Sequence, residues 1–305
     1  VLLKDIWQDQ FVFFTELSDN YFISRLIKSG ISPIVYVYSW DHPCKHIRFS
    51  KRLRYLVWHE GIEKDLNELQ HIPLENIRVF GATQMGYVER WLNQKDQLTN
   101  PFDFKYIYFG CAIGVPPIVP DELKIVRKVA EVMADIVPDW KLVVRPYPVM
   151  KDWTPYEELR KIPNLVLDDG FRSKTTSNIS TGEDFIMEKF SKIHYSGAFF
   201  HLGTTLGIEA SYTKAPSLLL DIREFNEDNA ILSLKNFIHQ YQNDKYIHLN
   251  EFPNVVLSIA GLKTCLEQLR DQPEIFQPYN KKVASDIQPK SFSQLASEFS
   301  LLLTA

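Results

Sequence analysis

Short apolar runs rich in β-branched and aromatic residues alternate with longer amphipathic stretches along most of this 305-residue chain. Strands of a parallel sheet are buried on both faces and read as continuous apolar runs, while the helices between them read as amphipathic stretches. One such series ends near residue 92, and a second begins at Tyr106 and continues to Asp221. We therefore predict an α/β fold with two Rossmann-like domains facing each other across a cleft.

We assign each apolar run to a strand and each amphipathic stretch to a helix. The expected strands are 11–15, 33–39, 54–58, 77–81, 106–109, 141–145, 164–167, 197–200 and 216–221. The expected helices are 19–29, 62–70, 84–92, 121–136, 155–161, 183–193, 204–212, 230–240, 255–270 and 291–303.

The polar segment 93–104 separates the two series, and domain boundaries fall in such stretches. We place an acceptor-side domain at residues 1–98 and a nucleotide-donor domain at residues 99–285. Residues 286–305 then form a C-terminal helix that returns towards the first domain. The sequence begins at Val1 rather than Met, so we expect an upstream segment to be missing and the first domain to be partial.

Composition narrows the class of protein. A net charge of −4 and a pI near 6.1 argue against a nucleic-acid partner. The three cysteines lie far apart and form no CxxC pair, which argues against a disulfide framework or a metal site and favours a reducing compartment. No apolar run reaches the roughly 20 residues that span a bilayer. We expect a cytoplasmic protein, with peripheral contact at the inner face of the membrane left open.

The most informative motif is the segment from His201 to Glu209, which reads as a strand end, a Gly/Thr turn and a helix. Ligands of open α/β sheets bind beyond the carboxyl ends of strands, and free N–H groups at a helix start favour a diphosphate. Gly203, Thr204 and Thr205 would hold that diphosphate, and Glu209 would hold a ribose diol. An ordinary helix cap with a surface glutamate fits the same pattern. No Walker lysine follows, so a P-loop is excluded.

Three further strand ends supply candidates for the same site. Arg145 offers a planar charged fork for phosphate, followed by Tyr147 between two prolines, although a stiff turn with a structural arginine fits as well. Gly110 and Gly114 bound a small-residue loop that would let the backbone approach a ligand. Asp168 follows another strand, near which a nucleobase would lie.

The order of these motifs resembles the donor half of GT-B glycosyltransferases and the related CDP-glycerol glycerophosphotransferases. The order is a small-residue loop, Arg-Pro-Tyr-Pro at 145–148, Gly-Thr-Thr-Leu-Gly-Ile-Glu-Ala at 203–210 and Lys-Ala-Pro-Ser-Leu-Leu-Leu-Asp at 214–221. In the first half, Ser-Trp-Asp-His at 39–42 and Val-Trp-His-Glu-Gly at 57–61 look similar to segments of bacterial members. The resemblance covers roughly residues 10–225 in order.

The resemblance implies transfer of a sugar from a nucleotide-diphosphate sugar to a glycan, lipid-linked or other cell-surface acceptor, with no further cofactor. His194, His239 and His248 have no ligand-like spacing, so we expect no metal site. Tyr147 stands where relatives usually have histidine, which favours sugar transfer over glycerophosphate transfer. His201 stands where a retaining enzyme would need an acid, which favours inversion. A CDP-glycerol-type glycerophosphotransferase, a sugar-nucleotide epimerase and a catalytically inactive GT-B-like binding subunit remain the alternatives.

An inverting transfer needs a carboxylate or histidine that takes the acceptor proton. Asp41 and His42 follow one strand of the acceptor-side domain, and His59 and Glu60 follow another. We select Asp41, His42 and Glu60 as candidates. Each has a structural alternative, since Asp41 can cap a loop and Glu60 can begin the next helix.

Overall fold

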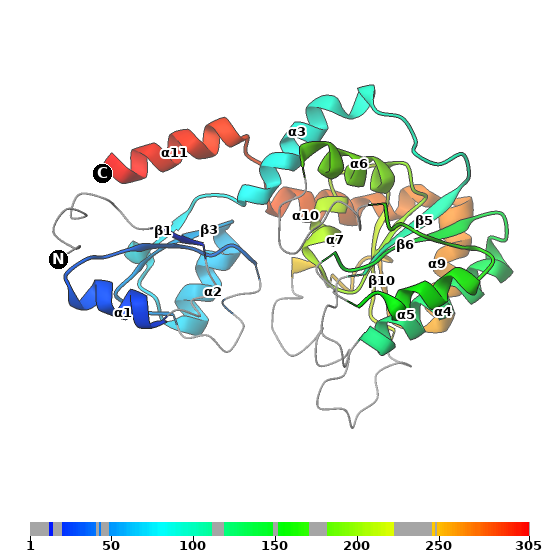
Figure 1. Cartoon of the computed structure of the whole chain (residues 1–305), viewed down its shortest axis with the longest axis horizontal. Coiled ribbons are helices and arrows are strands. Elements are labelled where there is room, and N and C mark those ends of the chain that lie inside the picture. The colour runs from blue at the N-terminus through cyan, green and yellow to red at the C-terminus, as the bar shows by residue number, and fades with distance from the viewer. Residues whose placement is uncertain are drawn as a thin grey trace. The chain divides into compact units, whose positions relative to one another are not determined.

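The computed structural model describes residues 12–14, 20–40, 43, 49–111, 119–148, 152–170, 182–222, 246–247 and 249–304 (Figure 1). These residues fall into two compact units. Unit 1 contains the described residues up to Arg90 and those from Asp286 on, and unit 2 contains those from Trp91 to Ser285. The division lies inside a helix, before the polar segment 93–104.

Unit 1 is built around a four-stranded parallel sheet. Its strands pair in the order β1 (Val12–Phe14), β2 (Ile34–Tyr36), β3 (Arg54–Val57) and β4 (Ile77–Val79). Its helices include α1 (Asn20–Lys28), α2 (Glu60–Gln70) and α11 (Phe292–Thr304), and α3 (Gly86–Gln94) begins in this unit. Gly30 has a φ of +81°, the left-handed conformation that commonly ends a helix, and it stops α1.

The segment around α11 packs on the residues that follow β4. Lys290 Nζ donates to the backbone oxygen of Phe80 at 2.7 Å and to both carboxylate oxygens of Glu298 at 2.9 and 2.7 Å. The ring of Phe299 meets that of Phe80 edge to face, with centroids 6.2 Å apart. One lysine therefore ties α11 to the end of the sheet within unit 1.

Unit 2 is built around a six-stranded parallel sheet with the order β10-β9-β8-β5-β6-β7. The strands are β5 (Tyr106–Gly110), β6 (Lys141–Arg145), β7 (Leu165–Leu167), β8 (Phe199–His201), β9 (Ser217–Leu220) and β10 (Val255–Val256). The helices are α4 (Val119–Ile136), α5 (Thr154–Glu157), α6 (Glu183–His194), α7 (Thr205–Ala210), α9 (Ile259–Asp271) and α10 (Gln277–Asp286). Numbered from β5, the strand order is 3-2-1-4-5-6, the order of a doubly wound nucleotide-binding sheet.

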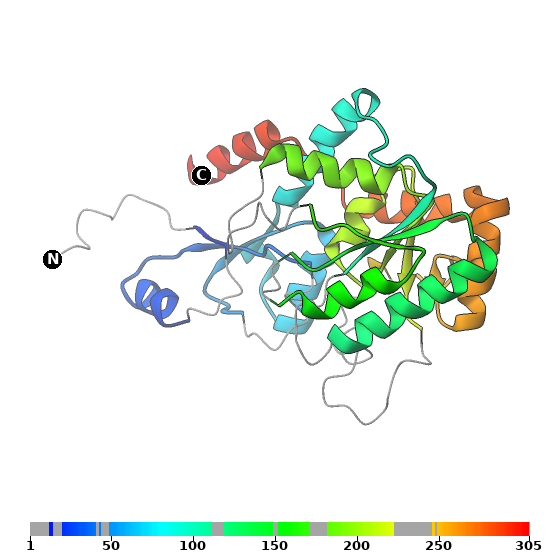
Figure 2. The same ribbon diagram turned by 45° about the vertical axis from the view of Figure 1, so that its right-hand side comes forward.

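The two faces of this sheet pack into separate apolar clusters. Successive side chains of a strand point to opposite faces. One face carries Ile107, Phe109 and Val144 into an apolar core shared with α4 and α9. The other face carries Tyr108 in a second apolar cluster, and Arg145 lies on that face at the end of β6. Figure 2 shows α4 and α6 on opposite sides of the sheet.

The helix that the sequence predicts over 255–270 is wrong at its start. Val255 and Val256 form strand β10 beside β9, and α9 begins only at Ile259, after Ser258 accepts a capping hydrogen bond from Gly261 N at 3.0 Å. A pair of β-branched residues before a capping serine fits a strand end better than a helix. The polar helix α10 was not expected, and the helix expected over 230–240 lies outside the described residues.

Candidate functional site

The strand order of unit 2 reverses between β5 and β8. These two strands are adjacent, and Gly110 at the end of β5 pairs in register with His201 at the end of β8. In open α/β sheets, ligands bind at the carboxyl edge where the order reverses. The Gly/Thr turn that follows His201 therefore lies at the position where such a sheet binds its ligand.

The turn after β8 has a defined backbone conformation. Gly203 has a φ of +86°, which glycine adopts without strain. The Thr204 side chain then accepts a hydrogen bond from Leu206 N at 3.0 Å and caps α7. Thr204 is therefore the ordinary helix cap that the sequence analysis gave as an alternative. The backbone N–H of Gly203 donates to His201 Nδ1 at 3.2 Å, so the histidine side chain also holds the turn in place.

His201 is a buried neutral imidazole. Burial lowers its pKa to about 3, so the ring carries no charge at neutral pH. Because Nδ1 accepts a hydrogen bond, the proton lies on Nε2, which has no hydrogen-bond partner among the described residues. A Cβ added at Gly207 would lie 2.4 Å from the imidazole Cε1. Glycine at that position lets α7 pack directly on the ring.

Arg145 and Asp168, which the sequence places at the ends of neighbouring strands, come together in the structure. Arg145 Nη1 lies 3.8 Å from Asp168 Oδ2, and the guanidinium lies over the ring of Phe185, 5.1 Å from its centroid. Only 5% of Arg145 is exposed. The guanidinium is thus held inside the protein rather than standing free at the surface.

Asp168 joins two further groups that the sequence did not reveal. Its Oδ1 accepts from Lys192 Nζ at 2.8 Å, and its Oδ2 accepts from the Tyr108 hydroxyl at 2.5 Å. Burial raises the pKa of Tyr108 well above its usual value, which keeps this hydroxyl a neutral donor. Lys192 also pairs with Glu188 at 2.8 Å. Lys192 follows Phe185 by seven residues, so both side chains lie on the buried face of α6. A lysine among the apolar positions of this helix was the sequence feature that could have revealed the cluster.

Glu209 is held by a cation instead of standing free on the surface. Lys189 Nζ of α6 donates to Glu209 Oε2, and both side chains are mostly buried. Lys189 Nζ also lies 4.7 Å from the centroid of the Phe190 ring. The ion pair joins α6 to α7 and holds one carboxylate oxygen of Glu209.

Gly110 serves internal packing. A Cβ at this position would lie 2.7 Å from the Phe199 ring and 2.9 Å from the Leu206 side chain, so protein atoms fill the space that a larger residue would need. Tyr147 follows β6 and is half-buried.

In unit 1, Glu60 is the exposed first residue of α2. His59 precedes it as the helix cap, and His59 Nδ1 accepts from Gly61 N at 3.0 Å. An acidic residue in the first turn also stabilises the helix dipole. The remaining candidates lie outside the described residues: Asp41, His42 and Gly114.

In the described ranges, no three His, Cys, Asp or Glu side chains gather as metal ligands would. None of the helices there is both long enough and apolar enough to cross a membrane.

No protein-family model matches this chain, and no curated protein sequence matches it. Several solved structures are similar to it in fold. A putative UDP-N-acetylglucosamine 2-epimerase from Listeria monocytogenes is 12% identical, with a TM-score of 0.53, and the match covers 97% of this chain and 73% of that one. The wall teichoic acid polymerase TagF is 14% identical, with a TM-score of 0.51, over 83% of this chain and 57% of that one. Anabaena HepE in complex with UDP-glucose is 7% identical, with a TM-score of 0.51, over 96% and 78%.

These similarities concern the fold. They confirm the predicted α/β class with parallel sheets and the predicted resemblance to GT-B-fold proteins. The chain spans less than two thirds of the TagF chain, at 57% of its length.

Proposed function

We propose that this chain is a GT-B-type glycosyltransferase whose nucleotide-sugar donor binds at the carboxyl edge of the six-stranded sheet in unit 2. The observation that carries the proposal is the turn at the point where the strand order reverses. There, Gly203 adopts a left-handed conformation and Thr204 caps the start of α7. The fold similarity to HepE, which was solved with UDP-glucose, supports the choice of donor class.

In this proposal, the backbone N–H groups and hydroxyls of Thr204 and Thr205 bind the diphosphate, and Gly203, whose own N–H donates to His201, sets the turn that presents them. Strands are spaced about 4.8 Å apart, so the end of β6 lies roughly 10 Å from the end of β8. Arg145 at the end of β6 adds positive charge from that side. Negative charge grows on the diphosphate as the sugar leaves, and fixed donors and cations in a buried environment stabilise it.

Asp168 and Glu209 have different proposed roles. Asp168 neutralises part of the charge of Arg145 and Lys192, and Glu188 also pairs with Lys192. Glu209 accepts from the ribose hydroxyls with the oxygen that Lys189 does not hold. Gly110, Gly114 and Tyr147 are further proposed parts of the donor site; Gly110 ends β5 and Tyr147 follows β6 at this edge.

We propose an inverting, metal-independent transfer to a glycan or lipid-linked acceptor. Asp41, His42 and Glu60 are the proposed candidates for the base that takes the acceptor proton. A neutral His201 cannot serve as the carboxylate that a retaining mechanism needs at that position. A cytoplasmic location fits the two buried free cysteines, Cys111 and Cys265.

The proposal is tested by thermal unfolding of the purified chain with UDP, GDP, CDP, CMP or CDP-glycerol, each compared with its nucleoside or with glycerol alone. We expect at least one nucleoside diphosphate to raise the Tm. At a concentration about 100 times its Kd, the ligand would stabilise the fold by about 2.7 kcal/mol. A response to cytidine compounds alone would favour glycerophosphate transfer. No response to any nucleotide would reject the donor site and favour a binding subunit.

A further inference from the structure

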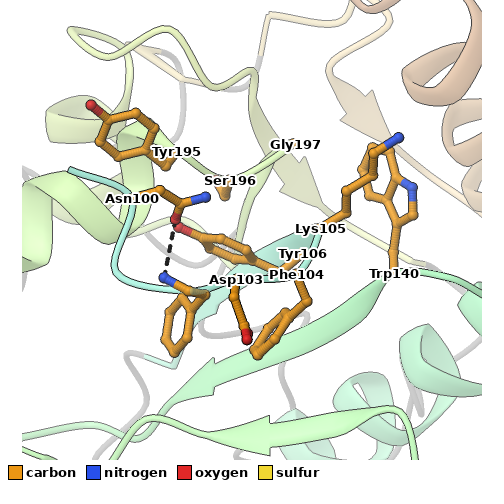
Figure 3. Close-up of a pocket in the computed structure, with 10 residues that line it drawn as sticks. Asn100, Asp103, Phe104, Lys105, Tyr106, Trp140, Tyr195, Ser196 and Gly197 are labelled. Atoms are coloured by element: carbon orange, nitrogen blue, oxygen red, sulfur yellow. Dashed lines mark hydrogen bonds between the residues drawn. The ribbon is translucent and has the colours of Figure 1, made fainter.

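A second concave site lies at the opposite edge of the same sheet. A pocket of about 560 Å³ is lined by residues that precede β5, β6 and β8, including Lys105, Trp140 and Gly197 (Figure 3). β5 has five residues, so its two ends are about 13 Å apart at 3.3 Å per residue. The pocket is therefore separate from the proposed donor site at the carboxyl edge. Its volume lies within the range of roughly 300–1,000 Å³ typical of ligand pockets.

Aromatic rings form a rigid wall of this pocket. The rings of Phe102 and Phe104 stack with centroids 5.1 Å apart, and Tyr106 meets Phe102 edge to face at 4.9 Å. The Tyr106 hydroxyl donates inward to Lys192 O at 2.8 Å. Tyr106 is fully buried behind Phe102 and Phe104, so the partly exposed rings of Phe102 and Phe104 are the aromatic surface that this wall offers to a ligand.

Trp140 and Tyr195 add two further rings. A Cβ added at Gly197 would lie 2.2 Å from Trp140 Cζ3, so the indole lies directly against the glycine backbone. Trp140 is only half-buried, and it packs on the edge of the apolar core. The Tyr195 hydroxyl donates to Leu98 O at 2.6 Å, which fixes that ring too. In Figure 3, Tyr195 and Trp140 stand on opposite sides of the pocket.

Polar side chains stand at the rim between the rings. Asn100 Oδ1 accepts from Phe102 N at 3.2 Å, which leaves the amide N–H groups for a ligand. Asp103 and Lys105 are exposed, and neither side chain makes a hydrogen bond or ion pair within the described part of the chain. The carboxylate and the ammonium have opposite charges, so the charged side chains that line the pocket balance each other, while the Lys214 ammonium outside the lining covers the Tyr195 ring at 4.5 Å from its centroid.

We propose that this pocket binds an uncharged saccharide unit. Aromatic faces pack against the C–H face of a sugar ring, and the carboxylate, amide and ammonium groups at the rim bond its hydroxyls. A purely apolar ligand would leave these polar groups unused, and a charged one would gain nothing from a balanced rim. A second saccharide contact on the chain would also raise the effective concentration of a glycan acceptor. Only this last consequence rests on the proposed function.

The test is saturation-transfer NMR on the purified chain with maltotriose, cellotriose and triacetylchitotriose, each at up to about 10 mM and each with and without UDP. We expect at least one trisaccharide to receive saturation through its ring C–H protons, with the same affinity when UDP is present. Asp103→Ala and Trp140→Leu should each weaken that binding about tenfold, the loss expected for a hydrogen bond to a charged group or for a stacking ring. Asp139→Ala is the matched control, because Asp139 is an exposed neighbour of Trp140 that does not line the pocket.

Several results would overturn the proposal. These are binding of none of the three sugars, equal binding by both pocket variants and the wild-type chain, or displacement of the sugar by UDP. A Trp-containing tripeptide or a sulfated trisaccharide that binds while all three neutral sugars fail would also overturn it, because the pocket would then take a peptide or an anion. Saccharide binding by a chain that binds no nucleotide would overturn the proposed function alone.

Discussion

Asp168 balances two buried positive charges, those of Lys192 and Arg145, on one face of the sheet in unit 2. It accepts hydrogen bonds from Lys192 and Tyr108 and lies 3.8 Å from Arg145. Removing one partner of a buried ion pair leaves an uncompensated charge and costs about 3–5 kcal/mol. We expect Asp168→Asn to lower the free energy of unfolding in urea by about that amount.

The adjacent residue supplies the control for this prediction. Asp169 pairs with Arg160, but both side chains are well exposed, and such pairs contribute about 0–1 kcal/mol. Asp169→Asn should therefore lose no more than about 1 kcal/mol. Equal losses in the two variants would show that the cluster around Asp168 is not electrostatically coupled.

His201 makes stability depend on pH in a defined direction. Its folded-state pKa of about 3 lies below the ordinary value of 6.5 because burial disfavours the charged ring. Between these values the unfolded chain binds a proton that the folded chain does not, so stability falls as pH drops through 6.5. His194, whose pKa burial lowers to about 4, adds to the same trend.

Urea unfolding between pH 5 and 6.5 should thus show a smaller pH slope in His201→Asn than in the wild-type chain. Near pH 5 the slopes of the two chains should differ by about 1.4 kcal/mol per pH unit, the value for one proton that the unfolded chain binds and the folded chain does not. His71→Asn is the control, since His71 is exposed. A slope that is unchanged in His201→Asn would mean that this ring is solvated in the folded chain.

At the scale of elements, the turn before α7 depends on one glycine. A Cβ at Gly203 would meet only Leu219, at 4.0 Å, so there is room for alanine, but the φ of +86° strains any L side chain. That strain is about 1–2 kcal/mol. We expect Gly203→Ala to weaken nucleoside diphosphate binding about tenfold as the turn relaxes, measured by isothermal titration.

Gly182 is the matched control for Gly203. It precedes α6 with a φ of −60° and has nothing within 4 Å of an added Cβ. Gly182→Ala should bind nucleotide as the wild-type chain does. If both variants bind equally, the conformation of the Gly203 turn does not matter to the ligand.

Periodicity predicted most elements of both sheets because each apolar run has the length and composition of a buried strand. It failed at Val255 and Val256, where a two-residue strand joins directly to a helix and leaves no separate apolar run. It also missed α10, whose sequence is mostly polar. There, a few buried side chains such as Tyr279 and Asn280 hold the helix, and their partners lie far away in sequence.

At the scale of the whole molecule, motif order predicted the strand ends at which Arg145, Asp168 and Gly203 lie. It could not predict that Lys192 and Tyr108 meet Asp168, because those contacts join residues that are 24 and 60 positions apart along the chain. Nor could it predict that Lys189 holds Glu209. Pairings across a sheet and its covering helix come from packing, which a linear pattern does not record.

Under the proposed function, a ribonucleotide donor binds beside α7 with its ribose on Glu209. Isothermal titration of the wild-type chain and Glu209→Gln with UDP and 2′-deoxy-UDP tests it most directly, or with the corresponding guanosine or cytidine pair if that base is preferred. Glu267→Gln, an exposed change in α9, is the control. The wild-type chain should prefer the ribonucleotide, and Glu209→Gln should bind it about tenfold more weakly and lose most of that preference. Unchanged affinity and unchanged preference in Glu209→Gln would contradict the account.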